Sequence, residues 1–162
     1  MAKEIERKFL VANDDWRDLA TSKTPMRQAY IVTMNDRSVR VRTRNDASAQ
    51  VTIKIGQNSL VRDEFEYTIP IAEAEEMISL AVGNVIEKVR YTVEYNGFIW
   101  EIDAYEGAYL GLVIAEVELS DENDEPPLPD WVGREVTGDR RYSNQSLATE
   151  KLETRLLDVL PN

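Results

Sequence analysis

The residues best suited to chemistry are charged side chains that recur at every second position. The chain begins Met-Ala-Lys-Glu-Ile-Glu-Arg-Lys-Phe-Leu, so Glu4, Glu6 and Lys8 are each separated by one residue. In a β-strand these three side chains would share one face, because successive side chains point to opposite sides. A face with two carboxylates and an ammonium group suits either a solvent-exposed strand or the inside of a polar tunnel.

Later segments repeat this spacing, with basic pairs and acidic pairs on different segments. Arg40 and Arg42 form one basic pair. Like charges two residues apart on a strand repel each other unless an opposite charge lies among them. Metal ions among the carboxylates and phosphate groups among the arginines would supply that charge. The other alternating positions are Thr52/Lys54, Lys88/Arg90, Glu64/Glu66, Glu101/Asp103 and Glu116/Glu118.

The composition narrows this chemistry. The 162 residues include no histidine and no cysteine, which excludes an imidazole base, a thiolate metal site and a cysteine nucleophile. A metal site would need oxygen ligands, and these favour Mg²⁺, Mn²⁺ or Ca²⁺ over zinc. A net charge of −11 disfavours nucleic acid and acidic membranes as partners, although a small polyanion could bind where basic residues converge.

The length predicts one globular domain over residues 1–162. We expect residues 1–120 to form most of it, and residues 121–162 to add an acidic, proline-rich loop and a helical C-terminal segment. No stretch is long and apolar enough for a membrane span, and the charged N-terminus does not resemble a signal peptide. Together with the lack of cysteine, this predicts a cytoplasmic protein.

Eight segments alternate charged and apolar residues, which predicts eight β-strands. Turns at Asn35-Asp36 and Asn96-Gly97 would join neighbours as hairpins, so the sheet should be mainly antiparallel. Apolar residues at helical spacing predict helices over 71–81 and about 145–160, and a short one over 14–20. The segments expected as strands are 4–10, 27–34, 37–44, 50–56, 60–69, 85–95, 98–106 and 112–120.

Two packings fit these elements. In an open sheet the charged face would meet water, and in a closed barrel of about eight strands it would face inward. Arginine pairs on some strands and carboxylate pairs on others favour the closed form, because a solvent face mixes charges more loosely. We therefore predict a mainly β (α+β) protein: an eight-stranded antiparallel barrel or tunnel with a charged interior, few peripheral helices and a C-terminal helix.

This ordered set of motifs resembles the CYTH superfamily, the triphosphate tunnel metalloenzymes. The E-x-E-x-K signature is intact at Glu4, Glu6 and Lys8, and the resemblance extends over nearly the whole chain to residues 139–144. It implies an eight-stranded tunnel, a triphosphate ligand and a divalent metal ion, Mg²⁺ or Mn²⁺. The start Glu-Ile-Glu-Arg-Lys-Phe-Leu looks most like the small bacterial inorganic tripolyphosphatases.

The residue types and the resemblance together assign roles to the charged faces. Basic side chains would bind phosphate oxygens, and carboxylates of the first and last strands would hold the metal ion. The resemblance alone implies a base formed by Lys88 with Tyr30. The expected phosphate ligands are Lys8, Arg40, Arg42, Lys54 and Arg90; the expected metal ligands are Glu4, Glu6, Glu116 and Glu118, with Glu64, Glu66 and Asp103 for a second ion or its waters.

The leading hypothesis is a metal-dependent inorganic triphosphatase that hydrolyses tripolyphosphate to pyrophosphate and phosphate. A class IV adenylyl cyclase, a thiamine or nucleoside triphosphatase, and a non-catalytic polyphosphate-binding module are the alternatives. The expected partner is a small polyanionic substrate, without nucleic acid or membrane, and the protein would be a monomer or a homodimer.

Overall fold

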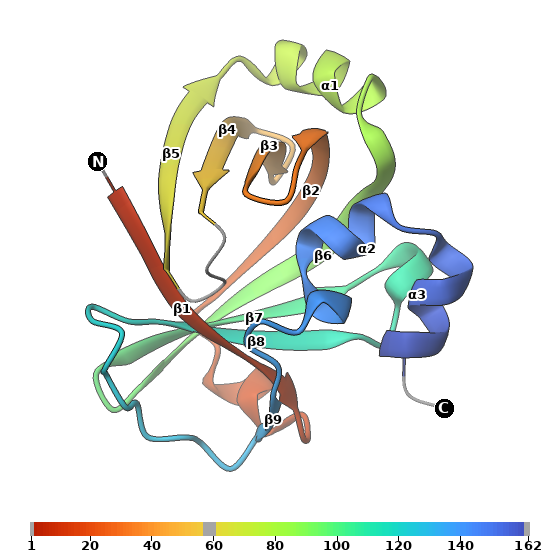
Figure 1. Cartoon of the computed structure of the whole chain (residues 1–162). Helices are drawn as coiled ribbons and strands as arrows, with labels where there is room; N and C mark the ends of the chain where they lie inside the picture. The colour runs from red at the N-terminus through yellow and green to blue at the C-terminus, as the bar shows by residue number, and fades with distance from the viewer. Residues whose placement is uncertain (1, 57–60, 161–162) are drawn as a thin grey trace.

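The computed structural model describes residues 2–56 and 61–160, and its main feature is a β-barrel (Figure 1). Every strand pairs antiparallel with its neighbours, and the first strand pairs with the fifth, which closes the sheet. The predicted closed antiparallel barrel is therefore confirmed. The start of the fifth predicted strand, at Leu60, lies outside the described residues. The barrel strands are β1 (Ala2–Val11), β2 (Ser22–Thr33), β3 (Arg37–Arg44), β4 (Ser48–Ile55), β5 (Val61–Ile69), β6 (Val82–Tyr95), β7 (Phe98–Tyr105) and β8 (Val113–Glu118).

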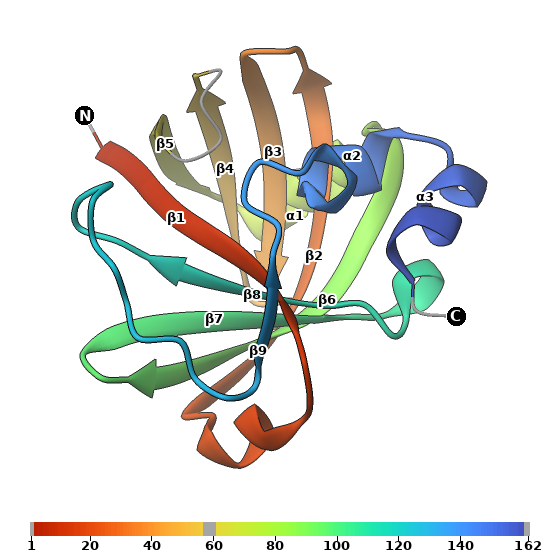
Figure 2. The same ribbon diagram turned by 60° about the horizontal axis from the view of Figure 1, so that its bottom comes forward.

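Strand β1 closes the barrel. The strand order is β5-β4-β3-β2-β6-β7-β8-β1, and residues 2–5 of β1 pair back onto β5. One edge of β1 pairs with β8, and its other edge is divided between β5 and an additional short strand, β9 (Val132–Glu135). Figure 2 shows β1 crossing the barrel front with β9 beside its C-terminal half. Strand β9 lies in the segment expected to be loop and helix, which carries no clear two-residue alternation.

The apolar core lies outside the strands, and the charged side chains point inward. Arg40 and Arg42 reach the interior, whereas Val41 between them is fully buried in a cluster beneath α1 (Ile71–Ser79). A second cluster contains Trp16 of a short 3₁₀ helix, and a third lies beneath the C-terminal helices. Because a strand alternates its faces, apolar packing outside leaves the polar positions no direction except inward.

The C-terminal helical segment differs from the prediction. In place of one helix over about 145–160, the chain forms α2 (Asn144–Thr149) and α3 (Leu152–Val159). Glu150 and Lys151 between them have extended backbone angles. The break lets α2 pack against β6 while α3 turns onto a different part of the barrel, the 3₁₀ helix at 107–109. In the described part of the chain, no helix has the length and apolar character that a membrane crossing requires.

The contact between β6 and α2 depends on a glycine, and this gives a test of the fold. Gly83 has φ +74°, and a Cβ there would lie 2.1 Å from the Ala148 carbonyl oxygen. We expect Gly83→Ala to lower the free energy of unfolding by about 3 kcal/mol, because the backbone is strained and α2 is displaced. Urea unfolding would measure the change.

The matched control is Gly97→Ala in the β6–β7 hairpin. Gly97 has φ +82°, but a Cβ there meets no atom within 4 Å. This variant should cost only about 1 kcal/mol, the strain of a left-handed residue that has a side chain. Equal losses in the two variants would show that the close approach of α2 contributes nothing to stability.

Candidate functional site

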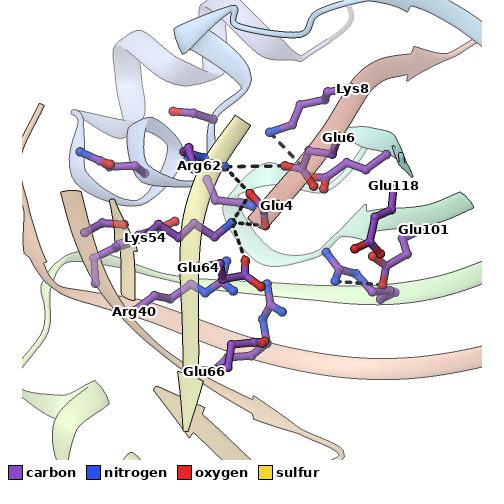
Figure 3. A pocket seen from close by; sticks show the side chains of 18 of the residues that line it. Glu4, Glu6, Lys8, Arg40, Lys54, Arg62, Glu64, Glu66, Glu101 and Glu118 are labelled. Atoms are coloured by element: carbon purple, nitrogen blue, oxygen red, sulfur yellow. Dashed lines mark hydrogen bonds and ion pairs between the residues drawn. The ribbon is translucent and has the colours of Figure 1, made fainter. Parts of the chain in front are cut away.

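A cavity of about 260 Å³ lies inside the barrel and is lined almost wholly by charged and polar side chains (Figure 3). Twelve of the fourteen predicted site residues line it, and the two exceptions are Lys88 and Asp103. The strands therefore do bring together side chains that are far apart in the sequence. Those twelve are Glu4, Glu6, Lys8, Tyr30, Arg40, Arg42, Lys54, Glu64, Glu66, Arg90, Glu116 and Glu118.

Strand β3 forms the most basic wall of the cavity. Arg40, Arg42 and Arg44 lie on one face of this strand, and none of them forms an ion pair with any described residue. Their side-chain acceptors among the described residues are neutral: Arg42 Nε donates to Gln28 Oε1 at 3.0 Å, and Arg40 Nη2 approaches Thr52 Oγ1 at 3.5 Å. Buried guanidinium groups without a carboxylate partner attract an anion.

Burial and neighbouring positive charges lower the pKa of Arg42. Its burial, together with the nearby Arg40 and Arg90, lowers the pKa of Arg42 to about 9. Burial is the larger cause of this shift, and repulsion among the positive charges of the wall adds to it. A polyanion placed against β3 would remove that repulsion and gain bidentate hydrogen bonds to guanidinium groups.

Carboxylates from β1, β5 and β8 form the opposing part of the cavity. Glu4 accepts from Arg62 Nη2 at 2.8 Å and pairs with Lys54 Nζ at 2.9 Å, as Figure 3 shows. Burial alone would raise the pKa of Glu4, but a hydrogen bond with Glu64 and the charges of Lys54 and Arg62 hold it well below its usual range. Glu4 is therefore ionised in the folded protein.

Two pairs of carboxyl groups face each other in this region. Burial and the adjacent Glu4 raise the pKa of Glu64 to about 7. In the second pair, burial and the charges of Glu116 and Glu4 raise the pKa of Glu6. Burial alone would raise the pKa of Glu116, but Lys8 and a hydrogen bond from Glu6 lower it to about 2. Each pair thus shares one proton between two acidic groups.

These carboxyl groups have the donor chemistry that Mg²⁺ and Mn²⁺ prefer. A divalent cation could replace the proton that each facing pair shares. Among residues 2–56 and 61–160, no three acidic side chains converge into a complete ligand set. In proteins, Mg²⁺ is commonly bound through one or two carboxylates, while water and substrate phosphates complete its coordination.

Lys88 and Asp103 lie behind the cavity and not on its surface. The fully buried Lys88 Nζ donates to Asp103 Oδ2 at 2.7 Å, and Arg90 donates to both oxygens of the same carboxylate at 2.7 and 2.9 Å. Although burial alone would raise it, the charges of Arg90 and Lys88 hold the pKa of Asp103 far below its usual range. Both Asp103 oxygens are used by these cations, so the geometry does not support the predicted metal-ligand role.

Lys88 is more deeply buried than Arg40 and Arg42, with 1% of its surface exposed against 5% for each arginine. Burial lowers the pKa of Lys88 to about 7, against the attraction of Asp103. Tyr30, its predicted partner, is also buried but lines the cavity, and it lies opposite Arg40 in the β2–β3 register. The structure therefore separates the predicted pair: Tyr30 faces the cavity, and Lys88 faces Asp103.

Several cavity residues were not among the predicted site residues. Arg62 ion-pairs with Glu4 and approaches Glu6 at 3.7 Å, and its alternation with Glu64 in the sequence was a usable signal. Residues 143–145 also line the cavity, from the start of α2. Their position depends on the docking of α2 against the barrel, and no periodic pattern in the sequence indicates it.

The chain is similar in sequence and fold to known proteins. The CYTH domain family matches residues 2–150. An inorganic triphosphatase of Acetivibrio thermocellus is 49% identical over 91% of this chain and 94% of its own. An inorganic triphosphatase of Nitrosomonas europaea is 34% identical over 90% of this chain and 96% of its own. The crystal structure of the inorganic triphosphatase NE1496 is 33% identical and superposes with a TM-score of 0.67, covering 93% of this chain and 97% of the other.

The raised pKa of Glu64 predicts a pH-dependent stability. Its folded value of about 7 exceeds its usual 4.5, so the folded state holds a proton that the unfolded chain releases. The stability this proton contributes is complete below pH 4.5 and is lost as the pH rises through 7. We expect the wild type to lose about 1 to 2 kcal/mol relative to Glu64→Gln between pH 4.5 and 8, allowing for solvent screening of a half-buried group.

Urea unfolding over this pH range, in EDTA so that no cation binds the carboxylates, would measure the difference. Glu66→Gln is the matched control, because Glu66 lines the same cavity two residues along β5 without a described hydrogen bond to Glu4. A constant difference between the wild type and Glu64→Gln at every pH would show that the two facing carboxyl groups do not share a proton.

Proposed function

The chain belongs to the CYTH family, and from this premise we propose that it is a metal-dependent inorganic triphosphatase. It would hydrolyse tripolyphosphate to pyrophosphate and phosphate, with Mg²⁺ or Mn²⁺. The observation that carries the proposal is the cavity, in which guanidinium groups of β3 that ion-pair with no described residue face carboxylates of β1, β5 and β8. Such a cavity suits a substrate that is both strongly anionic and bound to a cation.

The size of the cavity favours an inorganic substrate. Its volume of about 260 Å³ lies below the roughly 300–1,000 Å³ typical of pockets that enclose drug-sized organic ligands. The lining also contains little apolar surface: Tyr30 is its one aromatic residue among the described part of the chain. Both properties suit a compact polyphosphate better than a nucleoside or a thiamine ring system, which would need an apolar platform.

The basic residues would bind and orient the phosphate chain. Arg40 and Arg42 offer planar groups that can bind two phosphate oxygens at once, and Arg90 is held in place by Asp103. Lys8 and Lys54 would add point charges next to the carboxylates. Together these side chains would stabilise the charge of the transferring phosphoryl group.

We propose that carboxylates from the first and last barrel strands hold the metal ion. When bound, such an ion supplies Lewis-acid stabilisation of the phosphoryl charge. The residues that would hold it are Glu4, Glu6, Glu116 and Glu118, with Glu64 and Glu66 for a second ion or its waters.

The placement of Lys88 supports a positioning role in preference to proton abstraction. Lys88 and Arg90 share the carboxylate of Asp103, so Lys88 helps to fix the guanidinium group that would meet the substrate. Tyr30 remains the residue of the predicted pair that can contact substrate or water directly. We further propose that the protein acts in the cytoplasm, as a monomer or a homodimer, without nucleic acid.

A substrate panel tests the proposed function. The purified protein would meet tripolyphosphate, ATP, GTP and thiamine triphosphate with Mg²⁺, Mn²⁺ or EDTA, and every product would be identified. We expect phosphate and pyrophosphate chiefly from tripolyphosphate, with loss of activity in EDTA. Formation of cyclic AMP from ATP would contradict the proposed hydrolysis but not the proposed binding site. Binding of tripolyphosphate without turnover would show that the protein is a binding module and not an enzyme.

The variant Glu118→Gln links this activity to the cavity. Glu118 is exposed and forms no ion pair among the described residues, so its removal leaves no buried cation without a partner. We expect the metal concentration for half-maximal activity to rise about tenfold, with recovery at saturating metal. Glu76→Gln on the exposed face of α1 is the control; an equal change in both variants would contradict the assignment.

Steady-state kinetics can distinguish a positioning role of Lys88 from a role as the general base. Lys88→Met leaves Asp103 with Arg90 as its one cationic partner among the described residues. We therefore expect kcat/KM to fall about tenfold, mainly through KM, with an unchanged pH profile of kcat. Lys23→Met, at an exposed position of β2, is the control. A kcat loss of about 100-fold at constant KM, together with loss of an inflection near pH 7, would identify Lys88 as the base instead.

A further inference from the structure

The side chain of Asn144, the first residue of α2, lines the cavity and has one buried partner. The Tyr105 hydroxyl donates a hydrogen bond to Asn144 Oδ1 at 2.7 Å. We propose that Asn144 is a substrate-binding residue whose amide Nδ2 donates to an oxygen of the bound triphosphate, and that Tyr105 is the positioning residue that fixes the orientation of this amide. The inference rests on the proposed function and names a contact within its site.

Tyr105 is held rigidly and can act as a donor. It ends β7, is only 3% exposed, and packs with its ring edge-on to that of Tyr109 at a centroid distance of 6.4 Å. Burial, with the negative charges of Asp103 and Glu116 nearby, raises the pKa of Tyr105. The phenol is therefore neutral throughout the physiological range, and its proton is available for Asn144.

The orientation of the amide matches the chemistry of the ligand. An asparagine side chain offers one acceptor oxygen and one nitrogen with two N–H groups. Because Tyr105 occupies the oxygen, the nitrogen is the end that remains for the cavity, and it has no hydrogen bond to a described residue. An ionised phosphate oxygen only accepts hydrogen bonds. The reversed amide would present its carbonyl oxygen to the phosphate and repel it.

Residues other than Asn144 cap α2 and help to anchor it. Ser143 caps α2, since its hydroxyl accepts from the Ser146 amide at 3.0 Å. The helix is also anchored by Tyr109, whose hydroxyl donates to the Leu147 carbonyl oxygen at 2.7 Å. Asn144 is therefore carried on a fixed element while its own amide serves the cavity.

Steady-state kinetics with tripolyphosphate would test the contact. Asn144→Ala deletes the donor, and we expect KM to rise about tenfold with kcat changed less than twofold. Asn144→Asp keeps an acceptor for Tyr105 but turns a carboxylate oxygen toward the substrate, so KM should rise further. Asn13→Asp, the same change at an exposed loop position outside the cavity, should leave KM unchanged.

Tyr105→Phe removes the hydroxyl and retains the ring, which tests the positioning role. We expect KM to rise about threefold, because the amide is free to turn. In Tyr105→Phe/Asn144→Ala the KM should be no higher than in Asn144→Ala alone, since the hydroxyl acts only through the amide. Melting temperatures would show that each variant is folded, and a purely structural role would produce additive effects in the double variant.

Titration calorimetry with tripolyphosphate in EDTA separates this inference from the proposed function. A wild type that binds but does not hydrolyse tripolyphosphate would overturn the triphosphatase activity alone, and weaker binding by Asn144→Ala would still support the contact. A wild type that does not bind tripolyphosphate under any condition would overturn both. Asn144→Ala and Asn144→Asp with wild-type KM and affinity would overturn the contact while the function stands.

Discussion

The structure depends on the burial of like charges inside a closed sheet. Removing an unpaired charge from water is costly, and the β3 arginines have no carboxylate partner among the described residues. The cavity lining contains eight basic and seven acidic residues, so the interior is nearly neutral although the whole chain carries −11. The other basic residues lie among the carboxylates, as Lys54 and Arg62 do beside Glu4, but the three arginines of β3 form no ion pair with any described residue. The excess positive charge of the lining is therefore concentrated on β3.

The rest of the fold stabilises this charged lining. Apolar clusters beneath α1, around Trp16 and beneath α2 and α3 lie on the outer face of the strands, where most proteins of this size would have a central core. The charged lining can therefore be kept without loss of hydrophobic stabilisation, since the apolar side chains are buried elsewhere. Strand β1 completes the enclosure, because its pairing with β5 brings the first acidic residues next to Lys54 and Arg62.

A second layer of contacts holds the lining in place. Asp103 orients Arg90, Gln28 orients Arg42, and Tyr105 orients Asn144, each from a buried position. A binding group that is held by a buried partner loses less conformational freedom when the substrate arrives. The wall proposed to bind phosphate is thus preorganised, whereas a cation that bound between the facing carboxyl groups would displace the proton they share.

The sequence by itself determined the strands, their inward faces and most of the cavity lining, because alternation of charged and apolar residues is a local property. Tertiary structure alone decided which inward residues meet the cavity. Lys88 and Asp103 share the charged alternation, yet their mutual ion pair keeps both behind Arg90. Strand β9, the break between α2 and α3 and the placement of Asn144 likewise depend on contacts between segments distant in the chain, such as α2 with Gly83 of β6. Local periodicity carries no information about such contacts, because they are set by how the closed barrel brings its strands and helices together.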